Sequence, residues 1–194
     1  MEEFFDKMHR ALVRAAVDKH SPMRNAYLAT VDADGQPRQR TIVLRRYRHE
    51  NGAHFTFHTD DRSDKMNDLR VNPKVSLLFW HPRQRLQIRA AGTLTWENQT
   101  ERTRGHWNAL HVWGRKSYAT KLPPGTPLNA PSDNLPDLWR EKPPVEATEY
   151  AYPNFTLLDV EAHELELLEL DREAHRRAVW RFEEEKWRGT WIVP

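Results

Sequence analysis

Two segments of this sequence bring together cations and hydroxyls, the groups that bind phosphate oxygens. The first is a strand-like stretch, rich in β-branched residues, in which Arg40 and Arg45 stand a few positions apart. The second follows the next predicted strand and contains Thr59, Ser63 and Lys65 around a predicted helix start. Charge-assisted hydrogen bonds are the strong ones, and helix N-termini attract anions. These five residues therefore predict a phosphate clamp.

A simpler interpretation of the arginine-rich strand stays open. An unpaired buried charge is costly, so these arginines reach either water or an anion. Basic residues on an exposed strand edge also discourage aggregation, which needs no ligand. Strict alternation along a strand puts Arg40 and Arg45 on opposite faces. Only one of them would then point at a single anion, unless a bulge shifts the strand.

Other common reaction centres are missing from the sequence. It has no cysteine, which excludes disulfides, thiolate catalysis and cysteine metal sites. It also lacks HExxH, Gly-x-Ser-x-Gly, P-loop and dinucleotide-binding motifs. His106 and His111 do not have the i, i+4 spacing of a helical metal pair, so we expect solvated or core histidines and no metal site. An enzyme of this composition would rely on a cofactor, and we predict no catalytic side chain.

Composition and charge further restrict the classes of protein to which this chain could belong. A chain of 194 residues is long enough for one domain with a sizeable core. The formal net charge of +2 counts against a nucleic-acid binder that stacks bases on its tryptophans. The N-terminus lacks the order of a signal peptide, and no apolar run approaches the roughly 20 residues that span a membrane. We expect a soluble, cytoplasmic protein with no membrane and no nucleic-acid partner.

The first half of the chain predicts a mostly β framework around these residues. Apolar residues at helical spacing predict a helix over 2–19. Alternating residues and the hairpin turns Asp-Gly and Asn-Gly predict strands over 25–31, 38–47 and 53–59. Antiparallel strands joined by short turns favour a meander or barrel. A helix over 61–70 follows, with Asp61 as its N-cap.

The middle of the chain continues with strands and one more helix. A largely apolar strand over 74–80 reads as buried on both faces. Gly92, inside a strand over 86–95, suggests a bulge. The composition of residues 97–110 is typical of a helix.

Residues 122–153 differ in composition from the rest of the chain, because eight of the 13 prolines lie between Pro123 and Pro153. We expect an ordered loop that wraps a surface rather than regular structure. The apolar residues that could anchor it are Leu128, Leu135, Leu138 and Trp139. The remaining segments predict strands or an irregular arm over 154–160, 163–170, 172–182 and 186–194.

Taken in order, several short motifs resemble one known family. They are Ala29-Thr30-Val31-Asp32, Arg40-Thr41-Ile42-Val43-Leu44-Arg45, Phe57-His58-Thr59, Ser63-x-Lys65, Asn72-Pro73-x-Val75, Gln87-Ile88-Arg89 and His175-x-Arg177. Their order and spacing resemble the pyridoxamine 5′-phosphate oxidase family over almost the whole chain, least so over 122–153. The chain is more similar to the related subgroup of FMN-binding proteins than to the oxidase itself.

The resemblance implies a fold, a cofactor and a function. The implied fold is an FMN-binding split β-barrel, mainly β with flanking helices (α+β), antiparallel and Greek-key-like, as one domain over 1–194. The implied cofactor is FMN, bound at the interface of a homodimer. The implied function is an oxidoreductase acting on an unknown small substrate. A non-catalytic FMN-binding, storage or stress-related module is the alternative.

The resemblance also implies a set of site residues. The cofactor-binding residues would be Arg40, Thr41, Val43, Arg45, His58, Thr59, Ser63, Lys65, Gln87, Lys116, Ser117 and Arg177. Of these, Ser63 and Lys65 match a phosphate-binding turn, and Gln87 matches a glutamine near the flavin ring. Lys116 and Ser117 match a pair contributed across the dimer interface. His175 matches a residue on the substrate side.

Four departures from the family pattern bear on the reaction. Asp64 stands where the oxidase has a second phosphate-binding arginine, and Leu168 replaces a flavin-contacting tryptophan. Glu173 replaces an arginine that contacts the pyridoxal substrate, which would turn attraction for a phosphorylated substrate into repulsion. The segment 100–110 is also shorter than the one that carries the oxidase's substrate-phosphate contacts. The resemblance therefore implies FMN binding more firmly than oxidation of pyridoxamine phosphate.

Overall fold

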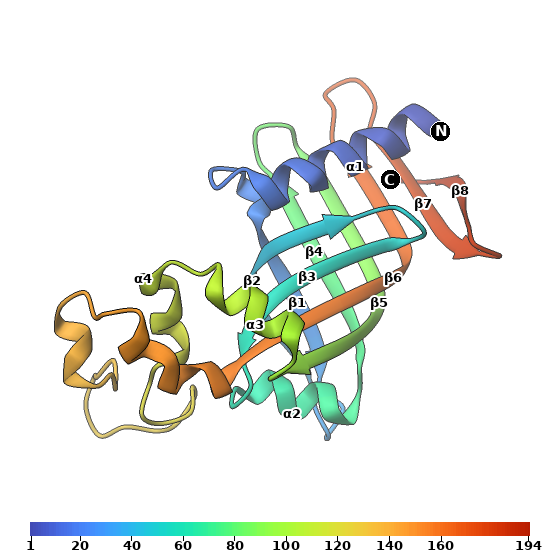
Figure 1. The fold of residues 1–194 in the computed structure, drawn as a ribbon. Helices are drawn as coiled ribbons and strands as arrows, with labels where there is room; N and C mark the ends of the chain where they lie inside the picture. Colours follow the sequence, from blue (N-terminus) through green and yellow to red (C-terminus); the bar gives the residue numbers. More distant parts are fainter. The chain divides into compact units, whose positions relative to one another are not determined.

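The computed structural model describes residues 1–194, mostly as strands with helices at their borders (Figure 1). The strands are β1 (Asn25–Val31), β2 (Pro37–Arg48), β3 (Ala53–Asp60), β4 (Lys74–His81), β5 (Leu86–Asn98), β6 (Phe155–Glu169), β7 (Arg176–Glu183) and β8 (Lys186–Ile192). The helices are α1 (Glu2–Val17), α2 (Asp64–Val71), α3 (Glu101–Asn108) and α4 (Val112–Arg115). Short 3₁₀ turns lie at Pro22–Arg24, Lys116–Tyr118, Asp137–Arg140 and Glu146–Asn154.

Six of the strands close into an antiparallel barrel. The order along the sheet is β3-β2-β1-β4-β5-β6, and β3 pairs again with β6. Because β4 returns to lie beside β1, the first four strands have Greek-key order. β7 and β8 extend the sheet beyond the barrel as an antiparallel hairpin. The mainly β fold with flanking helices that the sequence predicts is confirmed.

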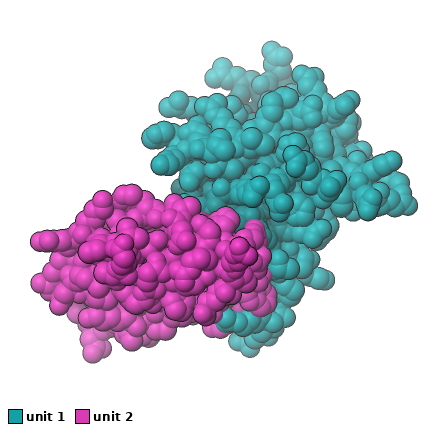
Figure 2. Space-filling model, viewed as in Figure 1, with its two compact units in different colours: residues 1–57, 68–95, 159–194 teal, residues 58–67, 96–158 magenta.

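The chain divides into two compact units, coloured separately in Figure 2. The barrel unit contains residues 1–57, 68–95 and 159–194, and the second unit contains residues 58–67 and 96–158. The single domain over 1–194 stays a prediction.

The core of the barrel unit follows from alternation along its strands. The inward residues of β2, Ile42 and Leu44, are buried, as are Leu77 and Phe79 on β4. Burying one such side chain contributes about 1.5–3 kcal/mol, and the barrel collects many of them. Helix α1 adds one apolar face, on which Phe4, Met8, Leu12 and Ala15 are buried.

The outward face of the barrel corrects the prediction that the strand over 74–80 is buried on both sides. Only alternate residues of β4 are buried, and Leu78 and Trp80 are half-buried. On the neighbouring strand Tyr27 is 47% exposed. In a closed barrel only one side of each strand faces the interior, so a continuous apolar run does not require two buried faces.

A bulge interrupts β2 at the second arginine of the predicted clamp. Leu44 pairs with Phe57 and Arg46 pairs with Thr56, so Arg45 is the extra residue. The buried positions change phase as a result, since Leu44 and Tyr47 both face inward. The bulge follows Leu44, so residues 40, 42 and 44 keep one phase and Arg45 is exposed on the opposite side from Arg40. The bulge therefore does not direct Arg40 and Arg45 at one anion.

Gly92 is not a bulge, contrary to the prediction. It pairs regularly with Val75 across β4 and β5. A Cβ atom built on Gly92 would lie 2.2 Å from the carbonyl oxygen of Glu161. The glycine is therefore required by the close approach of β5 to the backbone of β6.

Two predicted boundaries are also corrected. Helix α2 begins at Asp64 rather than at Asp61, because a turn at Asp60 comes first: the Asp60 carboxylate accepts the backbone N–H of Arg62 at 2.9 Å. The predicted strands over 154–160 and 163–170 form one strand, β6. No glycine or proline lies between them, so nothing in the sequence forces a turn.

The second unit is built around an aromatic cluster. Its buried members are Trp107, Tyr118, Ala119, Trp139, Ala151, Tyr152, Phe155 and Leu157. The predicted anchors of the proline-rich segment divide evenly: Trp139 is buried and Leu135 packs against the cluster, whereas Leu128 and Leu138 are exposed. Leu138 and Trp139 follow each other in a 3₁₀ turn, so they point in different directions.

No helix in the structure has both the length and the apolar character needed to cross a membrane.

Candidate functional site

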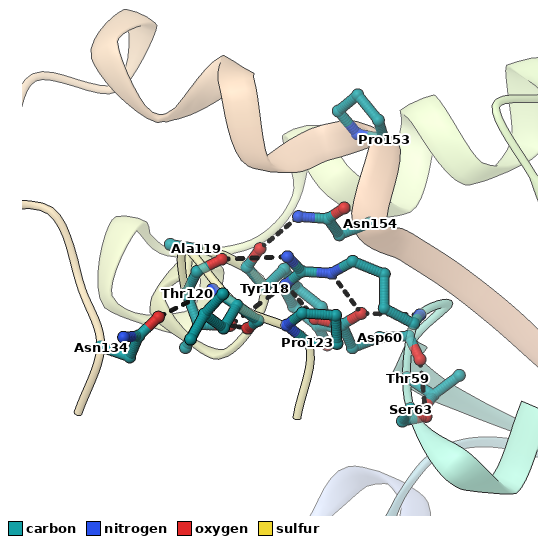
Figure 3. A network of polar contacts seen from close by, with 12 residues as sticks. Thr59, Asp60, Ser63, Tyr118, Ala119, Thr120, Pro123, Asn134, Pro153 and Asn154 are labelled. Carbon is teal, nitrogen blue, oxygen red and sulfur yellow. Dashed lines mark hydrogen bonds and ion pairs between the residues drawn. The ribbon is translucent and has the colours of Figure 1, made fainter. Parts of the chain in front are cut away.

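Three of the predicted phosphate-binding residues meet where β3 ends and α2 begins, in the second unit. The Lys65 ammonium donates to Thr59 Oγ1 at 2.9 Å and to Ser63 Oγ at 2.8 Å. The two hydroxyl oxygens lie 3.5 Å apart, a contact drawn in Figure 3. Thr59 and Ser63 are buried. We call Thr59, Ser63 and Lys65 the phosphate cradle, since one cation and two hydroxyls converge there.

The turn that forms the cradle is fixed by Asp60 and Arg62. The Arg62 guanidinium binds both carboxylate oxygens of Asp60, at 3.0 and 2.7 Å. It also donates to the backbone carbonyl of Thr120 at 3.0 Å and to the Thr120 hydroxyl at 3.1 Å. Nearby, the Asn154 side chain donates to the carbonyl of Tyr118 at 2.8 Å (Figure 3). Arg62 therefore holds the turn in place, and Lys65 is the cation of the cradle.

Arg40 lies in the barrel unit and is already paired. Its guanidinium donates to Asp68 Oδ2 at 3.1 Å and to Thr30 Oγ1 at 2.5 Å. The Thr30 hydroxyl in turn donates to the same Asp68 oxygen at 2.6 Å. Asp68 is buried, so its charge offsets that of Arg40. Sequence reasoning missed Asp68, because nothing in a short helical segment marks one acid as an arginine partner.

Four predicted residues belong to the outward side of the barrel. Thr41 and Arg45 are exposed, and Val43 and Gln87 are half-buried. The strand register places Thr41 directly beside Tyr27, and Gln87 directly beside Trp80. Thr41, Val43 and Gln87 thus share the outward side with the aromatic residues Tyr27 and Trp80, and Arg45 adds an exposed cation to it.

Arg177 is part of an ionic network on β5, β6 and β7. It donates to Glu166 Oε2 at 3.0 Å, and Arg89 approaches the same oxygen at 3.5 Å. Glu166 is buried, yet its second carboxylate oxygen has no hydrogen-bond partner, and neither has Arg177 Nε. Buried polar atoms without partners cost about 1–3 kcal/mol each, so this network is incomplete in the isolated chain.

His175 does not join that network. It lies in the turn before β7, where its Nδ1 accepts the backbone N–H of Asp171 at 3.1 Å. Glu173 lies in the same exposed turn, and its backbone N–H donates to the Asp171 carboxylate at 3.0 Å. The turn that contains the Asp171 carboxylate thus holds both His175 and Glu173, which the resemblance places on the substrate side.

His58 contacts a second histidine that the sequence did not pair with it. His58 Nε2 and His106 Nδ1 lie 3.1 Å apart, and the His58 ring meets the edge of Phe155 at 4.8 Å between centroids. One of the two facing nitrogens must carry a proton for this hydrogen bond to form. A separation of 48 positions in the chain gave no signal for the contact.

Lys116 and Ser117 lie in a 3₁₀ turn of the second unit, half-buried and exposed respectively. The residue before them, Arg115, is buried and donates to Glu149 at 2.8 Å and to Thr148 at 2.9 Å. Burial alone would raise the pKa of Glu149, but hydrogen bonds from Trp107 and Arg104 and the charges of both arginines lower it. The turn is therefore anchored by an ionised Glu149.

A comparison with known protein families shows which family this chain resembles. Residues 2–97, which include β1 to β4, most of β5 and the phosphate cradle, match the model of the pyridoxamine 5′-phosphate oxidase, FMN-binding domain. The chain belongs to this family. Its six-stranded barrel is the split barrel of that family, as the resemblance implied.

Related oxidases match over part of their length. A pyridoxine/pyridoxamine 5′-phosphate oxidase of Streptomyces avermitilis is 41% identical over 91 residues, which cover 44% of this chain and 39% of that protein. The corresponding oxidase of Bordetella petrii is 46% identical over 66 residues, covering 34% of this chain and 30% of that protein. The match thus spans well under half of these oxidases.

Solved structures match over nearly the whole chain. A pyridoxamine 5′-phosphate oxidase-related, FMN-binding protein of Nostoc punctiforme is 26% identical, with a TM-score of 0.76, covering 97% of this chain and 96% of that one. PhzG of Burkholderia lata, in complex with tetrahydrophenazine-1-carboxylic acid, is 19% identical, with a TM-score of 0.73, covering 98% of this chain and 92% of that one. The second likeness shows the fold alone.

Proposed function

We propose that this protein binds FMN and acts as a flavin-dependent oxidoreductase on a small organic substrate. The observation that carries the proposal is the phosphate cradle, because it lies inside the segment that matches the FMN-binding family. The partial similarity to pyridoxine/pyridoxamine 5′-phosphate oxidases supports the oxidoreductase class.

The donors of the cradle suit the phosphate of FMN. An ammonium group offers three N–H donors, and each hydroxyl offers one O–H. In the structure Lys65 donates to both hydroxyl oxygens, which leaves the hydroxyl hydrogens of Thr59 and Ser63 to other acceptors; that of Ser63 is given to the carbonyl of Asp60 at 2.7 Å. A phosphate oxygen is a stronger acceptor than a neutral carbonyl, so these hydrogens would turn to it.

The other proposed contacts come from the family resemblance. Gln87 and the outward residues of β2 would orient the flavin ring. Bound FMN would supply the redox chemistry by accepting or giving up a hydride equivalent. The chain's own residues would bind the phosphate, orient the ring and shape the surface that admits the substrate. No side chain is assigned a catalytic role.

We further propose that the active form is a homodimer. The outward side of the barrel presents Tyr27, 47% exposed, next to the half-buried Leu78 and Trp80. The incomplete network of Glu166 and Arg177 is a second surface that lacks partners. A second copy of the chain, or the cofactor it helps to hold, would complete both, as the family resemblance implies.

An FMN titration with matched variants tests the cofactor proposal. Lys65→Ala removes the cation of the cradle and should weaken FMN binding about 10- to 100-fold, the worth of one or two charge-assisted hydrogen bonds. Lys186→Ala removes an exposed lysine next to the turn between β7 and β8 and should leave the affinity unchanged. Quenching of flavin fluorescence gives both dissociation constants. Equal affinity of the two variants and the wild type would refute the assignment of Lys65.

Turnover requires a separate measurement. The FMN-loaded protein is mixed anaerobically with reduced nicotinamides and candidate amines, and bleaching of the flavin absorbance near 450 nm is followed. Flavin reduction by at least one class of donor, followed by reoxidation in air, is the expected result. Tight FMN binding without reduction by any donor would favour the non-catalytic, storage alternative.

A further inference from the structure

A basic cleft lies on the barrel unit, and no predicted site residue lines it. It is formed by α1, the residues that follow that helix, and the turn between β4 and β5, and it measures about 800 Å³. Volumes of about 300–1,000 Å³ are typical of small-molecule sites. The cleft is lined by Lys7, Arg10, Ala11, Arg14, Asp18, His20, Ser21, Pro22, His81, Pro82, Arg83, Gln84 and Leu86.

The charges of the cleft are unbalanced. Asp18 is its only carboxylate, and it accepts from Arg14 at 3.3 Å and from the backbone N–H of His20 at 2.8 Å. The hydrogen bond from His20, with the charge of Arg14, lowers the pKa of Asp18, so this acid is already ionised and engaged. Lys7 pairs with Glu169, which lies outside the lining. Arg10 and Arg83 remain, both exposed and neither with a carboxylate partner.

The two unpaired guanidinium groups come from separate elements that define the cleft. Arg10 projects from α1, and Arg83 belongs to the turn between β4 and β5. One acid near the turn, Asp171, is already the partner of the neighbouring Arg85 at 4.0 Å. Guanidinium groups bind phosphate in a bidentate manner, and cations on two walls can hold one ligand from both sides.

The turn also supplies a neutral donor and apolar surface. The backbone N–H of Gln84 donates to His81 Nδ1 at 3.2 Å, so the neutral ring of His81 carries its proton on Nε2. Pro22 and Pro82, both exposed, contribute apolar surface to the same lining, whereas Leu86 is buried. A purely inorganic anion would make no use of that surface.

We propose that this cleft binds a small phosphorylated organic molecule that carries at least two negative charges and a flat apolar body. Arg10 and Arg83 would hold the charged end, and the two proline side chains would pack against the body. The site is independent of the proposed FMN site, because none of the residues assigned to FMN lines it.

The test uses the full chain saturated with FMN and three probes: ADP, inorganic pyrophosphate and adenosine. Isothermal titration calorimetry should show ADP binding at least about 10-fold more tightly than pyrophosphate, because only ADP uses both charge and apolar surface, and no binding of adenosine. Arg10→Glu and Arg83→Glu should each weaken ADP binding at least about 10-fold. The FMN absorbance spectrum should not change in any titration.

A matched control separates the cleft from general charge effects. Arg140→Glu makes the same charge reversal at a side chain that is 82% exposed and does not line the cleft. It should leave ADP binding within about twofold of the wild type, since a solvent-exposed charge that does not line the site is screened by salt. The proposal is wrong if ADP does not bind, if Arg140→Glu weakens binding as much as the cleft variants, or if pyrophosphate binds as tightly as ADP. Release of FMN by ADP would place ADP in the flavin site instead and would also overturn it.

Discussion

At the scale of single residues, the stability of this fold depends on pH and on the presence of particular charges. His9 on α1 is buried, and burial together with the nearby His49 lowers the pKa of His9 to about 4. The Tyr47 hydroxyl is hydrogen-bonded to His9 Nδ1, and burial raises the pKa of Tyr47, so the phenol stays neutral and donates. His9 is therefore a neutral core residue at pH 7.

We predict that stability falls on acidification through His9. Its unfolded pKa is 6.5 and its folded pKa is about 4, so the unfolded chain binds more protons between these values. The contribution of His9 is complete above pH 6.5 and is lost as the pH falls towards 4. In His9→Gln the side chain stays neutral, so the loss of unfolding free energy on acidification should be smaller by about 2 kcal/mol. This is less than the free energy that corresponds to the whole pKa shift, because contact with solvent weakens the effect. Urea unfolding at several pH values measures it. Parallel profiles for wild type and variant would contradict the prediction.

Glu149 gives a second prediction for a single residue. It receives hydrogen bonds from Arg115 at 2.8 Å and from Trp107 at 2.9 Å, and it also pairs with Arg104. Glu149→Ala leaves the buried Arg115 without its counter-charge and should destabilise the second unit by about 2–3 kcal/mol. Glu146→Ala changes an exposed acid in the same 3₁₀ turn and should cost under about 0.5 kcal/mol. Thermal unfolding followed by tryptophan fluorescence compares the two, and similar melting temperatures would contradict the role of Glu149.

At the scale of elements, local pattern was enough for most strands. The strand over 25–31 is found as predicted, and the hairpin turns fall at Asp-Gly and Asn-Gly, because alternation and turn chemistry are both local. The predictions that failed concern features that depend on how the barrel closes. Whether the outer side of β4 is covered, and why residue 92 is a glycine, follow from neighbours far away in sequence.

The same substitution, glycine to alanine, should have opposite effects on stability at Gly92 and at Gly105. Gly92→Ala forces a Cβ to within 2.2 Å of the Glu161 carbonyl oxygen, so two paired strands must move apart. We expect a loss of about 3 kcal/mol or more, as for other overpacked sites. Gly105→Ala in α3 meets no atom within 4 Å and should stabilise by about 0.5–1 kcal/mol, because alanine favours the helix. Urea unfolding gives both free energies, and a neutral Gly92→Ala would show that β5 and β6 are not so close.

The site was predictable where its residues are close in sequence. Thr59, Ser63 and Lys65 span one turn, so their convergence follows from the end of a strand and the start of a helix. The partners Asp68 of Arg40 and His106 of His58 were not predicted, since each contact joins distant segments. Short-range pattern can place a phosphate donor, but it cannot show which charges are already neutralised.

At the scale of the whole molecule, the outward side of the barrel gives a prediction about assembly. If a second copy covers Tyr27, then Tyr27→Glu buries an unpaired carboxylate in the interface and should shift the protein to monomers. Val145→Glu introduces the same charge at a residue of the second unit that is 49% exposed, and it should leave the assembly unchanged. Sedimentation velocity distinguishes the two species. A wild-type protein that sediments as a monomer would rule out the proposed dimer.

Substrate choice gives the final prediction, and it concerns the charge that the molecule presents near the proposed flavin. Glu173 lies exposed in the turn after β6, with its backbone N–H bound by Asp171. The exposed carboxylate of Glu173 would repel a phosphorylated amine, so we expect little or no oxygen consumption with pyridoxamine phosphate. Glu173→Arg should lower the KM for this substrate at least about 10-fold and leave FMN binding unchanged, because the turn does not belong to the phosphate cradle. The control Glu161→Arg makes the same reversal at an exposed position within β6 and should change neither value. Rapid turnover of pyridoxamine phosphate by the wild type would show instead that Glu173 does not face the substrate.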